Sequence, residues 1–467
     1  MSSTTEDNVH PYTRDIAAFV AGLRYEDIPA HVRERIKLLI LDSLGCAIYG
    51  ANLPWSRILR ETLAGLEGGA GDCPVWGTDT RLSAPHAALA NGTQVQGFEL
   101  DDVHREGVLH VGAVVLPALL AAARARGGVD GRELLTAAVA GYEIGPRVGI
   151  CMGPEHIGQG WHSGATLGVF SAAAGAARGL GLDAQRTVHA LGIAGTQAAG
   201  LMAAQYGAMV KRMHAGRASQ SGLYGALLAR GGFTGIVNVL ESPYGGFCST
   251  FSRSQDRFRL EALTEGLGST WQTLGIALKF YSCVASNHTT LDAIRLMQAR
   301  RPFGADDVER IVVSGSQVTM DHVGWKYRPE GLTSAQLNLP FCVATLLLEG
   351  DCFVAQFSDD IVADPARMAL ADKVEVRHDA AITAKGGKHR HEVDVAVHLK
   401  DGTQLAEHVE SARGSERNFA PAQAVVDKFE KLAAYGLPAA RVAALRDAVL
   451  DLESLERAED LIALLAA

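Results

Sequence analysis

The sequence predicts a mainly α-helical protein with a large all-helical domain formed by both chain ends and a smaller inserted α+β lid domain. Apolar and small residues recur at helical spacing through most of the first 270 residues. After residue 271 short β-branched segments with alternating polarity appear, and helical spacing returns near the C-terminal end. We therefore place the helical domain at residues 1–270 and 411–467, and the α+β lid domain at residues 271–410.

The first half of the chain is read as a series of helices, several of them rich in alanine and separated by glycine. In residues 30–49 the apolar positions keep the helical period throughout. Pro54 and the glycines at 68–71 predict a loop, and a short extended piece follows it. Helices are predicted at residues 12–23, 30–49, 83–98, 114–126, 130–142 and 166–180.

The inserted region carries the strand signals. Residues 275–282 form a short apolar run with one lysine, and residues 308–315 alternate β-branched and polar side chains. Residues 391–399 and 404–409 flank an Asp-Gly pair, which is the usual turn of a β-hairpin. Helices are predicted at residues 287–299 and 338–349, and from residue 421 onward.

Composition limits the classes of protein that fit. With 467 residues, 48% hydrophobic and 20% charged, the chain is long enough for two globular domains. Its longest apolar run, residues 108–123, is interrupted by His110 and is too short to span a bilayer. The polar first residues lack the apolar core of a secretory signal, and the seven cysteines show no CxxC spacing. We therefore predict a cytoplasmic protein that does not enter a membrane.

The segment at residues 205–232 combines cations with a helix of small residues. Lys211, Arg212, His214 and Arg217 fall within seven residues at the start of this helical pattern. Small residues three and four positions apart share one face, which can pack closely against another helix. Because unpaired charge is costly in an interior, a buried anion site is one explanation. The alternative is that the cations reach water along the helix surface.

The charge around this segment favours a small anion as the ligand. Residues 184–240 contain no aspartate or glutamate, although the whole chain has a formal net charge of -9. Local positive charge on an acidic protein suits a small anionic ligand, whereas nucleic-acid binders usually present a broadly basic face. We predict a small-molecule anion as partner and no nucleic acid.

Two further places carry acid–base side chains. His162 lies just ahead of a predicted helix start. Carboxylates and histidines are concentrated in one segment: Glu99, Asp101, Asp102, His104 and His110. Asp101, Asp102, His104 and His110 could bind a divalent ion, but their spacing matches no recognised ligand motif, so we predict no metal. The GxGxxG, GxxxxGK[ST], HExxH and GxSxG motifs are absent. What remains is acid–base chemistry by histidine, lysine and carboxylate groups.

Five stretches, taken together and in order, resemble the MmgE/PrpD family. They are residues 99–123, 160–183, 209–235, 278–292 and 339–350. This family contains 2-methylcitrate dehydratase, cis-aconitate decarboxylase and iminodisuccinate epimerase. The resemblance implies a helical main domain with an inserted lid, an active site between them, a homodimer and a reaction without cofactor.

The resemblance also assigns roles to individual residues. The catalytic positions of the family fall on His162, Lys211, Lys279 and His110. The implied substrate-binding positions are Glu99, Asp101, His104, Arg212 and His214. Glu99 and Val103 stand where the family has aspartate and threonine, and Phe341 replaces a tyrosine. These departures speak against a dehydratase. The pattern of residues 99–104 with Leu-His at 109–110, together with residues 200–212 and 242–247, resembles the fungal cis-aconitate decarboxylase branch.

We therefore expect a cofactor-independent lyase that decarboxylates a cis-aconitate-like di- or tricarboxylate. Lysine and arginine would bind the carboxylates, and His162 or His110 would transfer the proton. An epimerase of an iminodisuccinate-like acid or a 2-methylcitrate-type dehydratase would use the same residues, so both alternatives stay open. A third alternative is a non-catalytic anion-binding scaffold.

Overall fold

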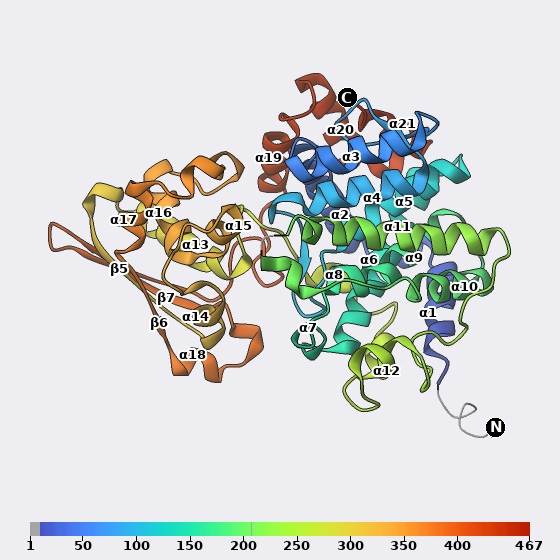
Figure 1. Ribbon diagram of the computed structural model, residues 1–467, viewed down its shortest axis with the longest axis horizontal. Coiled ribbons are helices and arrows are strands. Elements are labelled where there is room, and N and C mark those ends of the chain that lie inside the picture. Colours follow the sequence, from blue (N-terminus) through green and yellow to red (C-terminus); the bar gives the residue numbers. More distant parts are fainter. Residues whose placement is uncertain (1–9, 207) are drawn as a thin grey trace. The chain divides into compact units, whose positions relative to one another are not determined.

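The computed structural model describes residues 10–206 and 208–467, and its contacts divide the chain into two compact units. Unit 1 comprises the chain up to Gly97, Asp101–Ala277 and Pro421–Ala467. Unit 2 comprises Phe98–Leu100 and Leu278–Ala420. Helices predominate, which confirms the mainly α fold (Figure 1). That unit 2 acts as a lid stays a prediction.

Unit 1 is built from helices contributed by both ends of the chain (Figure 1). Its longer helices are α1 (Tyr12–Gly22), α2 (Ala30–Gly50), α3 (Pro54–Glu67), α4 (Ala84–Val95), α5 (Val111–Arg126), α6 (Gly131–Met152), α9 (Gly168–Gly179), α10 (Ala184–Gly195), α11 (Val210–Arg230), α19 (Ala422–Ala433) and α20 (Ala439–Leu450). Shorter helices are α7 (Glu155–Gly158), α8 (Ser163–Thr166), α12 (Phe247–Ser252) and α21 (Ala458–Leu464).

Helix α11 lies in the interior of unit 1, packed against α4, α5, α9 and α10. A Cβ atom on Gly216 would come within 2.1 Å of the Leu89 carbonyl oxygen of α4. One on Gly222 would come within 2.4 Å of the Ala172 Cβ atom of α9. The small residues therefore let neighbouring backbones approach directly, as their spacing predicted. Close packing on several sides fixes the position of the cationic start of this helix.

Two local predictions were wrong. The expected loop at residues 54–71 contains helix α3. Pro54 occupies its first turn, where a missing N–H costs nothing, and Gly68 ends it with a left-handed φ of 61°. The strand expected at residues 275–282 is reduced to β4 (Ile276–Ala277), which pairs with β3 (Val103–His104). A separate two-stranded sheet joins β1 (Cys73–Pro74) to β2 (Arg81–Leu82).

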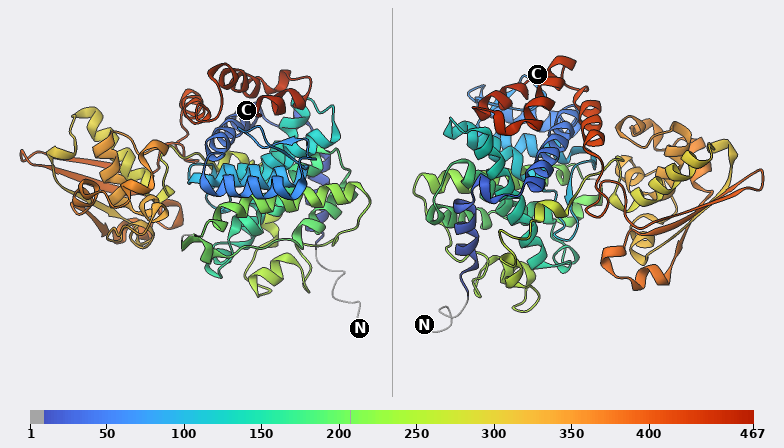
Figure 2. Two further views of the ribbon diagram at one scale, coloured as in Figure 1. Left: turned by 45° about the horizontal axis from the view of Figure 1, so that its top comes forward. Right: turned by 180° about the vertical axis from the view of Figure 1, so that it is seen from behind.

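Unit 2 contains a four-stranded sheet in the order β6-β5-β7-β8. Its strands are β5 (Val308–Gly315), β6 (Val374–His378), β7 (Val393–Leu399) and β8 (Gln404–Val409), and only β5 and β6 pair in parallel. The predicted hairpin is confirmed, with Gly402 of the Asp-Gly pair at a φ of 86°. Figure 2 shows this sheet from two further directions.

The helices of unit 2 pack on or beside its sheet. They are α13 (Ala285–Arg300), α14 (Gln317–Val323), α15 (Leu332–Leu337), α16 (Leu339–Glu349), α17 (Pro365–Ala371) and α18 (Ala380–Ala384). Helix α13 packs on β7 and β8, and α14 packs on β5 and β6.

No single helix in the described part of the chain is both long enough and apolar enough to cross a membrane. By length and composition alone, α2 and α3 pass together as a pair bent by 81°. All seven cysteines are buried and none forms a disulfide.

Candidate active site

The first turns of α11 contain the four basic residues that we identified in the sequence. Arg212 and His214 are buried, Lys211 is half-buried and Arg217 is exposed. The Arg212 guanidinium carbon lies 5.6 Å from the ring centroid of Trp55 in α3, a cation–π contact that accompanies its burial. The interior position is therefore confirmed for Arg212, whereas Arg217 reaches solvent as the alternative explanation proposed.

His162 and His214 are brought together from separate segments. Their ring centroids are 4.6 Å apart and the ring planes are inclined by 52°. His162 immediately precedes α8, and its backbone N–H donates to the Gly200 carbonyl at 3.1 Å. The neighbouring residues Trp161 and Leu201 form an isolated antiparallel bridge, which holds this backbone in place. His162, predicted to be catalytic, and His214, predicted to bind substrate, therefore contact each other near the start of α11.

The environment of His214 keeps its imidazole neutral. Burial lowers the pKa of His214, and the nearby Lys211 ammonium lowers it further. Its Nδ1 atom is buried and has no hydrogen-bond partner among the described residues. Buried polar atoms almost always have a partner, so an imidazole nitrogen of this kind suits hydrogen bonding to a ligand.

A second histidine is oriented by a buried carboxylate. His110 Nδ1 lies 2.9 Å from Asp101 Oδ2, and the Asp101 side chain is fully buried whereas His110 is partly exposed. A carboxylate at Nδ1 fixes the tautomer and orientation of an imidazole, leaving Nε2 for proton transfer. Asp101 thus takes the position of an orienting group for His110, at the start of α5.

Asp102 caps the start of the same helix. Its two carboxylate oxygens accept from the Gly112 N–H at 3.0 and 3.2 Å. Burial, followed by the adjacent Asp101 charge, raises the pKa of Asp102 to about 8. The side chain is therefore a neutral carboxylic acid at neutral pH, which limits the negative charge behind His110.

The titration of Asp102 predicts a pH-dependent stability. The pKa of Asp102 is raised in the folded state. The stability that this group contributes is therefore fully present below its unfolded-state pKa of about 4, and it is lost as the pH rises through about 8. Asp102→Asn removes this titration. We expect urea unfolding to show that the free energy of unfolding of the variant falls less steeply than that of wild type between about pH 5 and about pH 8. Parallel profiles for the two proteins would contradict this assignment.

Glu99 and Lys279 both belong to unit 2, where they pair with each other. Lys279 Nζ lies 3.2 Å from the Glu99 carbonyl oxygen and 3.5 Å from its Oε2 atom. Both side chains are buried. Sequence reasoning gave the two residues separate roles and missed this pairing, because they are 180 positions apart. A catalytic role for Lys279 and a substrate-binding role for Glu99 stay predictions.

Both domains of one family match this chain. Residues 14–259 match the MmgE/PrpD N-terminal domain and residues 281–454 match the MmgE/PrpD C-terminal domain. The chain belongs to the MmgE/PrpD family.

Relatives of this MmgE/PrpD protein match it over almost its full length. It is 36% identical to a cis-aconitate decarboxylase-like protein of Aspergillus oryzae, over 99% of this chain and 98% of that protein. It is also 36% identical to a cis-aconitate decarboxylase of Aspergillus terreus, over 97% of this chain and 95% of that protein. A mouse cis-aconitate decarboxylase is 27% identical over 95% of this chain and 91% of its own length.

The remaining predicted residue of this MmgE/PrpD site, His104, has partners for both ring nitrogens. Its Nδ1 accepts from the Gly107 N–H at 2.9 Å, and its Nε2 lies 3.1 Å from the Gln272 side-chain oxygen. This arrangement is typical of a structural histidine that fixes a loop. A role for His104 in substrate binding stays a prediction.

Backbone strain marks the segment that ends at His110. Val108 has a φ of 48°, a left-handed conformation that is rare for a β-branched residue. Its carbonyl oxygen accepts a hydrogen bond from the Ser163 hydroxyl, next to His162. The segments that carry the two predicted catalytic histidines are thus joined directly. Strained residues of this kind cluster at functional sites, where surrounding contacts hold them.

Sequence reasoning missed a buried ion pair behind this site. Lys428 Nζ of α19 lies 2.5 Å from Asp42 Oδ1 of α2, and both side chains are at least 98% buried. Burial and the neighbouring Asp101 charge both raise the pKa of Asp42, and the Lys428 ammonium opposes them. Asp42 interrupts an apolar run, but Lys428 lies among the charged residues Asp427, Glu430 and Lys431, so the pair could not be recognised from the sequence.

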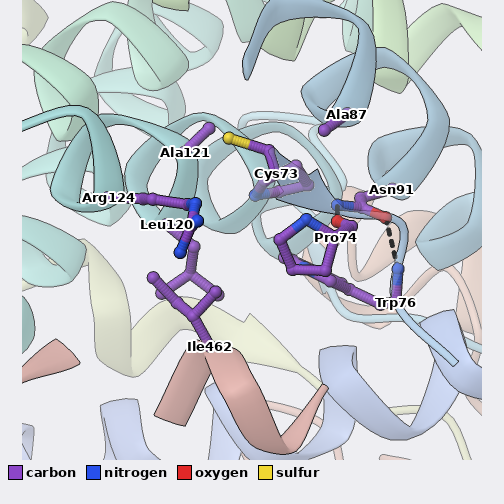
Figure 3. A pocket seen from close by; sticks show the side chains of 10 residues that line it. Cys73, Pro74, Trp76, Ala87, Asn91, Leu120, Ala121, Arg124 and Ile462 are labelled. Carbon is purple, nitrogen blue, oxygen red and sulfur yellow. Dashed lines mark hydrogen bonds between the residues drawn. The ribbon is translucent and has the colours of Figure 1, made fainter. Parts of the chain in front are cut away.

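A small cavity lies elsewhere in unit 1, lined by residues that include Cys73, Trp76, Asn91 and Ile462 (Figure 3). None of the predicted catalytic or binding residues lines it. Its volume of about 10 Å³ is close to the smallest that holds one water molecule, so it does not suit a polycarboxylate.

Proposed function

We propose that this MmgE/PrpD protein is a cofactor-independent lyase that decarboxylates cis-aconitate or a closely similar tricarboxylate. The observation that carries the proposal is the contact of His162 with His214 beside Lys211 and Arg212, at the packed start of α11. The full-length similarity to proteins named cis-aconitate decarboxylase supports the choice of substrate and reaction.

In this proposal Lys211 and Arg212 bind substrate carboxylates through charge-assisted hydrogen bonds. Each such bond contributes about 1.5–3 kcal/mol when a charged group takes part. The neutral imidazole of His214 adds a hydrogen bond without adding charge. The absence of aspartate and glutamate from residues 184–240 keeps competing anions out of this stretch of the chain.

The reaction breaks the carbon–carbon bond to one carboxylate, which leaves as carbon dioxide. The electron pair of that bond stays on the substrate and delocalises toward a remaining carboxylate, where a cation stabilises the developing charge. A proton from His162 then forms the new carbon–hydrogen bond, with His110 as the other available donor. The products are carbon dioxide and a dicarboxylate with one more hydrogen on carbon.

A substrate panel tests this proposal. Purified protein is incubated separately with cis-aconitate, 2-methylcitrate and iminodisuccinate, and the products are followed by NMR. We expect loss of cis-aconitate with release of carbon dioxide, and no change in the other two acids. Turnover of 2-methylcitrate or iminodisuccinate instead would identify a dehydratase or an epimerase. No turnover of any acid would favour an anion-binding scaffold. The homodimer and the cytoplasmic location stay predictions.

A further inference from the structure

A compact cluster of ionisable side chains lies in unit 2, around hairpin β7–β8 and the turn before it. Its members come from three short segments that the sheet brings together: Lys385, His389, Glu392, Asp394, His408, Glu410 and Arg417. None of these residues is among those proposed above for the reaction.

Glu392 is the centre of this cluster. Its side chain is only 1% exposed, and His389 Nδ1 lies 2.8 Å from its Oε2 atom. His408 Nε2 lies 3.4 Å from its other oxygen, Oε1, which also contacts the Lys385 ammonium. Burial opposes ionisation of Glu392, but the bonds from Lys385 and His389 outweigh it and lower the pKa of this carboxyl. Glu392 is therefore a buried carboxylate that faces two imidazoles.

The spacing of the polar atoms is that of ligands around one small ion. His389 Nδ1, a Glu392 oxygen and a Glu410 oxygen all lie within 4.8 Å of one another. Ligands bound tetrahedrally at about 2.0–2.2 Å stand about 3.3–3.6 Å apart. The His389–Glu410 separation of 3.5 Å agrees with that value, whereas His389 and Glu392 are closer, at 2.8 Å. His408 lies outside this group of three, although its Nε2 atom is 3.4 Å from Glu392.

His408 has a second feature typical of a metal-binding histidine. Its Nδ1 atom lies 2.8 Å from Asp394 Oδ1, on the directly opposite residue of β7. Metal-binding histidines usually donate their other ring N–H to a carboxylate, which fixes the ring and raises its basicity. When Asp394 accepts the Nδ1 proton of His408, the Nε2 atom is unprotonated, and its lone pair is available to a metal ion beside Glu392.

We propose that His389, Glu392 and Glu410 bind one divalent transition-metal ion of the Zn²⁺ class, and that the half-exposed His408 side chain turns toward the ion as a fourth ligand. Two imidazoles and two carboxylates suit this borderline ion, and the two negative charges balance it. The partly exposed Lys385 and Arg417 side chains, which pair with Glu392 and Glu410, can swing into solvent when the ion takes their place. The ion would tie the turn at residues 387–392 to the end of β8, in a structural role.

Metal titration of the full-length protein tests this site. The protein is prepared without a histidine tag, treated with EDTA, and titrated with Zn²⁺ by calorimetry and with Co²⁺ by visible absorption. We expect one Zn²⁺ per chain, a higher unfolding temperature with Zn²⁺, and Co²⁺ d–d bands of a four-coordinate nitrogen–oxygen site. Absence of both the heat of binding and the Co²⁺ bands in wild type would overturn the proposal.

Variants locate the ion. The double variant His389→Gln/His408→Gln should lose Zn²⁺ binding, and Asp394→Asn should weaken it about 10–100-fold through the orientation of His408. His398→Gln changes a histidine of β7 outside the cluster and serves as the matched control, with binding as in wild type. Circular dichroism verifies that each variant is folded. Equal Zn²⁺ affinity in the double variant and in wild type would also overturn the proposal.

Discussion

His162→Asn is expected to lower kcat for cis-aconitate decarboxylation about 10²–10⁴-fold, the range for loss of a general acid. This corresponds to about 2.7–5.5 kcal/mol of transition-state stabilisation. Asparagine keeps a polar side chain beside His214 but cannot transfer a proton near neutral pH. Because Lys211 and Arg212 still bind the carboxylates, KM should change far less than kcat. Steady-state kinetics measured by carbon dioxide release tests this expectation.

The control for His162 is His189→Gln, which alters a half-buried histidine of α10 outside the proposed site. Its activity should stay close to that of wild type, and both variants should keep the wild-type circular dichroism spectrum. If His162→Asn turned over at the wild-type rate, His162 would be removed from the catalytic step and His110 would become the remaining candidate.

Lys428→Met is expected to cost about 3–5 kcal/mol of folding free energy. The variant leaves the Asp42 carboxylate fully buried without its ammonium partner, and Asp101 adds further negative charge nearby. Breaking one side of a buried pair is costly because the remaining charge has no compensation. Urea unfolding at neutral pH measures the loss. Lys431→Met, on an exposed position of the same helix, is the control and should change stability by less than about 0.5 kcal/mol.

A second substitution separates charge from packing. In the double variant Asp42→Asn/Lys428→Met, the buried carboxylate is gone, so much of the lost stability should return. If the double variant were no more stable than Lys428→Met, lost packing rather than uncompensated charge would explain the effect. A single variant as stable as wild type would show that the pair contributes little to the fold.

Sequence patterns predicted those helices and turns that are determined by residues close together in the chain. The small-residue face of α11 and the Asp-Gly hairpin of unit 2 follow from spacing and turn chemistry, which the neighbouring backbone only reinforces. Helix α3 was missed because Pro54 and Gly68 were read as loop residues, although proline suits the first turn and glycine the end of a helix.

The candidate site was predictable in its residue types but not in its pairings. Family resemblance suggested His162 and Lys211 as catalytic residues, and the structure added the His162–His214 contact and the Asp101–His110 pair. Pairings such as Glu99 with Lys279 depend on tertiary contacts between distant segments, which one sequence without an alignment does not contain. The ionisable cluster around Glu392 was missed for the same reason.

The most direct test of the proposed chemistry is the fate of the hydrogen on carbon. Cis-aconitate is incubated with the protein in deuterated buffer, and the products are examined by ¹H and ¹³C NMR. Decarboxylation with proton return by a histidine predicts one carbon dioxide and one new carbon–deuterium bond per molecule of dicarboxylate formed. A hydroxy-acid product, or deuterium exchange into the tricarboxylate without carbon dioxide release, would contradict a decarboxylase and point to hydration or epimerisation chemistry.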